Sequence, residues 1–116
     1  MQLIYQNNSQ KQLVSWWNLQ TYGGADPQTY INGMETYMKS NSIGVTNANE
    51  MMLAGVAVYS TSAPADVQQQ LAAYQSMGLK GGWIWNFANI LSTPSTPTEF
   101  ATAIEQGLQS SSAATA

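Results

Sequence analysis

Three stretches of the chain combine apolar, β-branched and aromatic residues in the way that is typical of buried strands. They are residues 13–22, 51–59 and 82–87, and glycine, proline, asparagine or serine residues bound each of them. A helical pattern follows each stretch. The chain is therefore predicted to alternate strand and helix three times.

The first predicted helix has the clearest pattern. Asp26 is a suitable N-cap, and Pro27 then occupies the first helical position. Apolar residues follow at helical spacing and build one stripe, which consists of Tyr30, Ile31, Met34, Tyr37 and Met38. This face is expected to pack on the sheet.

The other two helices carry start and stop signals. Pro64 opens the second, and Gly78 suits the position just past its end. Thr96 and Glu99 form a capping box at the start of the third. Their apolar faces consist of Val67, Leu71 and Tyr74 in the second helix, and Phe100, Ile104 and Leu108 in the third. Asp66 and Glu99 stand in first helical turns, where a carboxylate complements the helix dipole.

This alternation predicts an α/β fold with parallel strands and right-handed helical crossovers. One domain is expected over residues 1–109, followed by a mobile, low-complexity tail over residues 110–116. Residues 2–6 suggest a further strand, but six residues cannot hold a crossover helix before the next one. That strand would pair antiparallel, lie at an edge, or belong to a unit whose helix is missing.

Charge and composition exclude several classes of function. The 116 residues include three lysines and six acidic residues but no Arg, His or Cys, and the net charge is −3. No histidine-based triad, thiol nucleophile or imidazole metal site is therefore possible, and no basic patch is available for nucleic acid. No cofactor is expected, since Gly81-Gly82 is not a dinucleotide fingerprint. No apolar run is long enough to span a membrane, and the first ten residues do not resemble a secretory signal.

The carboxyl ends of parallel strands are the expected place for chemistry. Alternation places Asn18, Gln20 and Tyr22 on one face of the first strand, which suits a cleft for a polar, uncharged ligand. Trp83, Trp85 and Phe87 would share a face of the last strand and form a flat apolar floor for a sugar ring. The alternative is that these aromatic residues are simply core.

Catalytic carboxylates are missing from these positions. None of the six acidic residues lies within a predicted strand, and Glu50 precedes the second strand at the end opposite the cleft. Glycosidic hydrolysis needs a general acid and a second stabilising group. The chain is therefore expected to lack a catalytic acid of its own.

The three strand ends resemble a known family. Residues 15–22 (SWWNLQTY), 55–59 (GVAVY) and 78–85 (GLKGGWIW) are similar to the sixth, seventh and eighth strands of glycoside hydrolase family 18, the chitinases and related endo-N-acetylglucosaminidases. Those enzymes are (β/α)8 TIM barrels. The resemblance implies that this chain is the C-terminal three βα units of such a barrel, incomplete as it stands.

The resemblance also implies roles for particular residues. Tyr22 would hydrogen-bond the N-acetyl group of the sugar at the cleavage point, with Gln20 beside it and Trp85 as the floor under the ring. Together with Tyr59 these are the expected substrate-binding residues. The family's proton donor belongs to a DxxDxDxE motif, which this sequence lacks. The chain would then bind β-1,4-linked N-acetylglucosamine glycans without cleaving them alone.

Two other classes of function remain open. The chain could be a catalytically silent glycan-binding or assembly module, or a small α/β domain with no ligand. Three strands cannot close a barrel, so the remainder of a barrel, or a second copy of the chain, would have to cover the exposed sheet unless the chain rearranges into a small open sheet. The resemblance and the low charge favour secretion.

Overall fold

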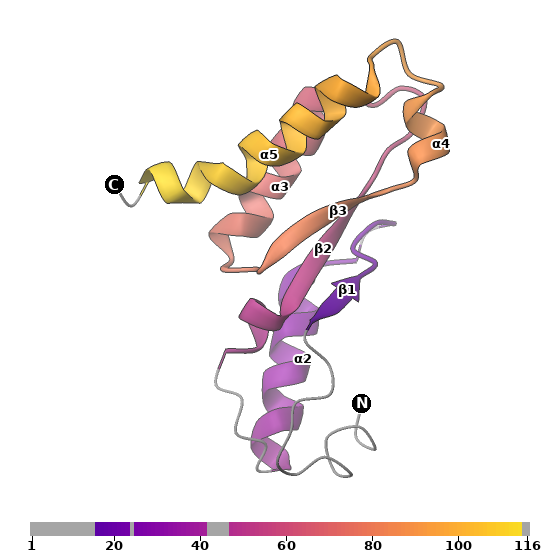
Figure 1. Ribbon diagram of the computed structural model, residues 1–116. Helices are drawn as coiled ribbons and strands as arrows, with labels where there is room; N and C mark the ends of the chain where they lie inside the picture. The colour runs from indigo at the N-terminus through magenta and orange to yellow at the C-terminus, as the bar shows by residue number, and fades with distance from the viewer. Residues whose placement is uncertain (1–15, 24, 42–46, 115–116) are drawn as a thin grey trace.

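The computed structural model describes residues 16–23, 25–41 and 47–114, with the backbone alone for residues 110–114. Figure 1 shows the strands of the sheet and the helices that connect them. The strands are β1 (Trp17–Leu19), β2 (Met52–Ala57) and β3 (Gly81–Trp85). The helices are α2 (Pro27–Ser40), the 3-10 helix η1 (Ala48–Met51), α3 (Pro64–Ser76), α4 (Phe87–Ile90) and α5 (Pro97–Ala114).

The strands form one parallel sheet in the order β1-β2-β3. The register places Leu19 of β1 and Gly82 of β3 on either side of Ala54 in β2. Strand order therefore equals chain order, and β1 and β3 are the edges of the described sheet. The prediction of an α/β fold with parallel strands is confirmed.

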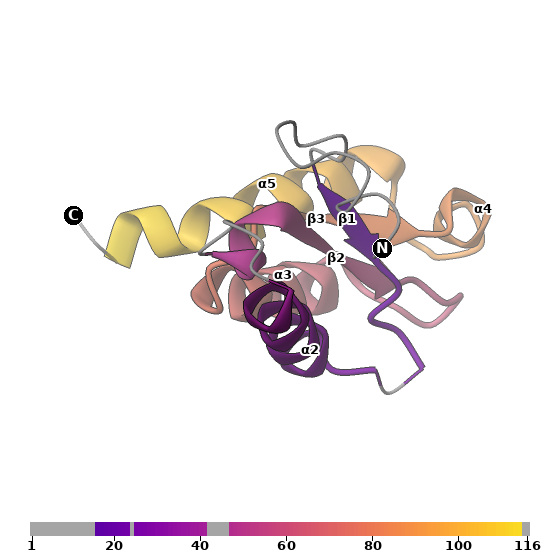
Figure 2. The ribbon, with the colours of Figure 1, turned by 90° about the horizontal axis from the view of Figure 1, so that it is seen from below.

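The long helices cover the face of the sheet that carries Leu19, Ala54 and Gly82. Leu19 and Ala54 share a buried cluster with apolar residues of α2: Ile31, Met34 and Met38. On the same face, Val56 and Ile84 pack with Leu71 of α3 and Phe100 of α5. Figure 2 shows α2 and α3 on one side of β2. This face holds the core of the molecule.

The opposite face of the sheet carries Leu53, Gly55 and Ala57 of β2 and Gly81, Trp83 and Trp85 of β3, with Asn18 on β1. We call it the open face. The two buried clusters that hold α2, α3 and α5 contain none of these residues. Parallel sheets are usually covered on both faces. As far as the described residues go, the open face is therefore the side on which a ligand or further polypeptide has room to bind.

Helices α3 and α5 run side by side over the sheet (Figure 1). Gly107 makes this approach possible, because a Cβ atom there would lie 2.8 Å from the carbonyl oxygen of Gln68 and 2.9 Å from the Cβ of Leu71. The predicted apolar face of α5 is confirmed, with Phe100 buried and Ile104 and Leu108 packed against the same cluster.

The predicted caps of α2 and α5 and the predicted glycine after α3 are confirmed. The amide of Gln28 donates to Oδ1 of Asp26 over 3.1 Å, so Asp26 caps α2 with Pro27 first in the helix. Gly78 follows α3 with a φ of 78°, a left-handed conformation that favours glycine. Helix α5 continues through Ala114, into the segment expected as a tail.

All three strands end earlier than predicted: β1 ends at Leu19 and not at residue 22, and β2 ends at Ala57 and not at residue 59. β3 ends at Trp85, and Phe87 begins the short helix α4 instead of continuing the strand. The reason is local: Oδ1 of Asn86 accepts a hydrogen bond from the amide of Asn89 over 3.2 Å and so caps a helix. Phe87 consequently does not share a strand face with Trp83 and Trp85. The possible strand at residues 2–6 and the start of the stretch 13–22 lie outside the described residues.

The capping box of α5 gives a prediction about pH. Hydrogen bonds from Thr96, first from its backbone N–H and then from its hydroxyl, hold the pKa of the exposed Glu99 carboxyl below its ordinary value of 4.5. A lowered folded-state pKa means that the stabilisation is complete above about pH 4.5 and is lost as the pH falls through the lowered value. Glu99→Gln should therefore lower the Tm at neutral pH, and the difference from wild type should shrink on acidification.

Thermal melts monitored by circular dichroism between about pH 7 and pH 3 measure this effect. Glu105→Gln is the matched control, because it removes one negative charge from α5 without changing the cap. A Glu99→Gln deficit that stays constant down to about pH 3 would contradict the assignment.

Candidate functional site

Three aromatic side chains meet on the open face at the carboxyl ends of the strands. The Tyr22 and Trp85 rings lie 6.2 Å apart between centroids with 17° between their planes. Trp83 meets both edge-on, at 6.0 Å from Tyr22 and 6.4 Å from Trp85. Offset and edge-on packing are the favoured arrangements of aromatic pairs. We call these three residues the aromatic cluster.

Trp85 is the exposed member of the cluster. Its side chain is 51% exposed, whereas Tyr22 and Trp83 are half-buried. Within the described residues, Trp85 therefore does not belong to the core. The predicted flat floor is also wrong, since the planes of Trp83 and Trp85 stand at 89° to each other. Within the aromatic cluster, Trp85 is the ring most open to a ligand, and Trp83 meets it edge-on.

Trp83 is held close to the sheet by the absence of a side chain at Gly55. A Cβ atom on Gly55 would lie 2.8 Å from the Trp83 ring and 3.0 Å from the carbonyl oxygen of Leu19. The indole Nε1 of Trp83 is buried and has no hydrogen-bond partner. A buried donor without an acceptor is unfavourable by roughly 1–3 kcal/mol. The cluster thus carries an unsatisfied donor.

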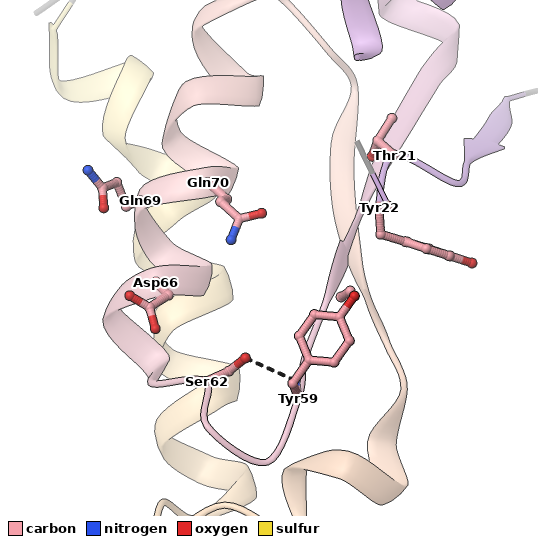
Figure 3. Close-up of a pocket in the computed structure, with 9 residues that line it drawn as sticks. Thr21, Tyr22, Tyr59, Ser62, Asp66, Gln69 and Gln70 are labelled. Carbon is pink, nitrogen blue, oxygen red and sulfur yellow. Dashed lines mark hydrogen bonds between the residues drawn. The ribbon is translucent and has the colours of Figure 1, made fainter. Parts of the chain in front are cut away.

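A cavity of about 400 Å³ lies beside the cluster, between the ends of β1 and β2 and the first turns of α3 (Figure 3). Its lining consists of Thr21, Tyr22, Gly23, Ala57, Tyr59, Ser62, Asp66, Gln69 and Gln70. In Figure 3 the side chain of Gln70 points from α3 toward the strand ends, while the ring of Tyr22 points away from α3. Amides, hydroxyls and two tyrosines make this a polar cavity.

Local hydrogen bonds fix the walls of the cavity. The buried hydroxyl of Thr21 donates to the carbonyl of Gly55 over 2.7 Å and ties the end of β1 to β2. The amide of Tyr59 donates to Oγ of Ser62 over 2.9 Å, which closes the turn that leads into α3. The positions of Tyr22 and Tyr59 are therefore set by ordered backbone.

The structure brings together some, but not all, of the four residues predicted to bind substrate, which are Gln20, Tyr22, Tyr59 and Trp85. Tyr22 and Tyr59 line the cavity, whereas Trp85 does not belong to the lining and stacks on Tyr22. Gln20 is exposed and does not belong to the cavity lining. The predicted alternation along the first strand nevertheless holds, because Leu19 and Thr21 are buried while Asn18 and Gln20 face outward.

Sequence reasoning missed the contribution of α3 to the cavity. Ser62, Asp66, Gln69 and Gln70 come from the turn after β2 and the first two turns of that helix. The available signal was the short connection over residues 58–63, which forces the start of α3 back beside the strand ends. A helix that begins there presents its first polar residues to the same cavity.

All six acidic residues lie in the described part of the chain, and none is on a strand. Asp66 is the acidic residue that lines the cavity, and its Oδ2 accepts a hydrogen bond from the amide of Ala63 over 2.9 Å. Glu50 lies in η1, before β2 begins. The expectation that no carboxylate lies on a strand is confirmed.

No cluster of three metal-binding side chains occurs among the residues that the structure describes. Within those same residues, no helix is both long and apolar enough to cross a membrane. Comparison of the chain with protein-family models, with curated proteins and with solved structures finds no match. The site must therefore be interpreted from its own geometry.

Proposed function

We propose that the chain binds β-1,4-linked N-acetylglucosamine glycans at the aromatic cluster, as the C-terminal three βα units of a chitinase-like (β/α)8 barrel. The observation that carries this proposal is the half-exposed ring of Trp85, stacked on Tyr22 at the carboxyl edge of the open face. Pyranose rings have apolar CH faces that stack on aromatic side chains. Tyr22 links this ring to the polar cavity, because it stacks on Trp85 and also lines the cavity, whose polar groups suit sugar hydroxyl and acetamide groups.

The one-sided placement of helices supports the barrel part of the proposal. In a (β/α)8 barrel the helices lie outside and the inner face of the strands is filled by side chains. Here α2, α3 and α5 occupy one face, and the open face carries Trp83 with its unsatisfied Nε1. Further strands across the open face would supply both apolar cover and an acceptor for that donor.

The acidic residues favour a second candidate, a glycan-binding module without catalysis. Hydrolysis assisted by the substrate acetamide still requires a carboxylic acid at the leaving oxygen. No strand of the chain carries one, and Asp66 already serves as acceptor at the start of α3. Under both proposals the chain alone should bind the glycan without hydrolysing it. Adding a barrel half that carries the acid distinguishes the two proposals, because hydrolysis should be restored only if the chain is part of such a barrel.

Trp85→Ala tests the proposed site. Isothermal titration with soluble chito-oligosaccharides should give a Kd at least about tenfold weaker than wild type, because truncation of a central aromatic contact removes more than about 1.4 kcal/mol. Tyr22→Phe should weaken binding by about two- to tenfold through loss of one hydrogen bond.

Trp16→Ala is the matched control for this experiment. Trp16 is 50% exposed, close to the value for Trp85, but lies at the amino end of the sheet, 6.0 Å from the Nζ of Lys80. Its removal should leave the Kd unchanged. Equal affinity of wild type, Trp85→Ala and Tyr22→Phe would reject the proposed site.

A further inference from the structure

We propose that Asn89 is a positioning residue for the candidate site, because its side-chain amide sets where Trp85 lies relative to Tyr59. Asn89 itself lies outside both the cavity lining and the aromatic cluster. This inference rests on the proposed function, since it assigns a role in the site that would bind the glycan. It concerns hydrogen bonds that join the ends of β2 and β3 to α4.

The carbonyl group of Val58 explains why a side-chain donor is needed here. Val58 directly follows β2 and is 0% exposed. Its amide extends the sheet by one hydrogen bond, since it donates to the carbonyl of Trp85 over 2.6 Å. Strand β3 ends at Trp85 and the chain turns into α4, so no further strand residue of β3 follows to donate to the Val58 carbonyl. A buried carbonyl left without a donor is unfavourable.

Asn89 supplies the missing donor. Its Nδ2 donates to the Val58 carbonyl over 2.7 Å. Its backbone amide donates to Oδ1 of Asn86 over 3.2 Å, and Asn86 directly follows Trp85. Three hydrogen bonds therefore connect Val58, Trp85, Asn86 and Asn89, and we call these four residues the Asn89 network.

The two exposed rings of the site both depend on this backbone. Trp85 belongs to the Asn89 network, and its side chain is 51% exposed, so burial restrains the ring only in part. Tyr59 directly follows Val58, is 58% exposed and lines the cavity. Binding residues keep their geometry when supporting hydrogen bonds fix them from behind. The amide of Asn89 is the side-chain group that ties the backbone at one ring to the backbone at the other.

Helix α4 holds Asn89 on a fixed base. Ile90, the next residue, is 5% exposed and belongs to the buried cluster with Phe100. That core contact does not involve the Asn89 side chain. The Asn86 cap also survives a substitution at Asn89, because the cap uses the backbone amide of that residue. A change of the Asn89 side chain therefore removes the link to Val58 and leaves the other anchors of α4 in place.

The test compares two asparagines with similar hydrogen bonds. Asn89→Asp keeps the size of the side chain but loses the Nδ2 donor. Asn49→Asp is the matched control: Nδ2 of Asn49 donates to the carbonyl of Met77 over 3.2 Å, is likewise partly buried, and lies in η1, before β2 begins. Each variant gains one negative charge and loses one side-chain donor, so general destabilisation should be similar in the two.

Nuclear magnetic resonance detects the indole N–H groups of the four tryptophans, and a Trp85→Phe variant identifies the signal of Trp85. We expect Asn89→Asp to shift this signal and Asn49→Asp to leave it unchanged. Isothermal titration with soluble chito-oligosaccharides should give a Kd at least about threefold weaker for Asn89→Asp, and within about twofold of wild type for Asn49→Asp. Asn89→Ala and Asn49→Ala are measured in parallel, because they remove the same donors without adding a charge.

The outcomes separate this inference from the proposed function. An unshifted Trp85 signal in both Asn89 variants, or an equal shift in the Asn49 variants, overturns the role of Asn89 whether or not the glycan binds. A shifted signal with an unchanged Kd also overturns it, because Asn89 would then move Trp85 without acting on the site. Wild type that binds no chito-oligosaccharide overturns the proposed function, and the indole signals alone then decide whether Asn89 positions Trp85.

Discussion

Phe100→Ala is expected to lower the free energy of unfolding by about 3–5 kcal/mol, the range for truncating a buried phenylalanine. Phe100 is 1% exposed and is the largest fully buried side chain in the described residues. It packs from α5 among Val56, Val58 and Leu71, at the point where two helices meet the sheet. Its removal leaves a cavity that three elements would have to collapse together to fill.

Chemical denaturation monitored by circular dichroism measures this loss. The chain contains two phenylalanines, so Phe87→Ala is a control of the same chemistry at a side chain that is 61% exposed. That variant should change the free energy of unfolding by less than about 0.5 kcal/mol. Similar losses in the two variants would mean that the core is not centred on Phe100.

Gly55→Ala should destabilise the protein by about 1–3 kcal/mol and weaken glycan binding at the same time. The new Cβ would overlap the Trp83 ring at 2.8 Å and press against the Leu19 carbonyl oxygen at 3.0 Å. Both neighbours are constrained, one by the aromatic cluster and the other by the β1 backbone. The least costly response is for Trp83 to move off the sheet, which removes its support for Tyr22 and Trp85.

Near-ultraviolet circular dichroism reports the rearranged aromatic rings, and titration with chito-oligosaccharides reports the site. Gly33→Ala is the control, and it should raise the free energy of unfolding. A Cβ atom at Gly33 meets nothing within 4 Å, and alanine is favoured over glycine in a helix by about 1 kcal/mol. Unchanged near-ultraviolet spectra in Gly55→Ala would show that the cluster does not depend on this contact.

Local signals in the sequence were sufficient for the three long helices α2, α3 and α5. Asp26-Pro27 and the Thr96/Glu99 box predicted where α2 and α5 begin, because capping is decided by residues within one turn. The apolar stripes then predicted which faces are buried, except at Tyr30 of α2, which is 43% exposed. These are short-range features, and one sequence contains them completely.

The shape of the site depends on features that the sequence pattern does not show. The pattern of alternating aromatic residues suggested that the strand runs through Phe87, yet the Asn86 cap turned the chain into α4. The packing of Trp83 over Gly55 joins two strands that are distant in the sequence. Likewise, Gln70 lines the cavity because of the direction in which α3 runs. Tertiary packing sets that direction.

Because strand order equals chain order, further strand-helix units could be added at either border of the sheet. β1 and β3 each present an unpaired backbone ladder in the described sheet, and each is flanked by its own helix on the covered face. A duplicated strand-helix unit could join either ladder without rethreading any existing connection. The architecture therefore tolerates growth by whole repeats at both borders, whereas a strand inserted between β1 and β2 would separate Tyr22, which follows β1, from Trp83 and Trp85 of β3.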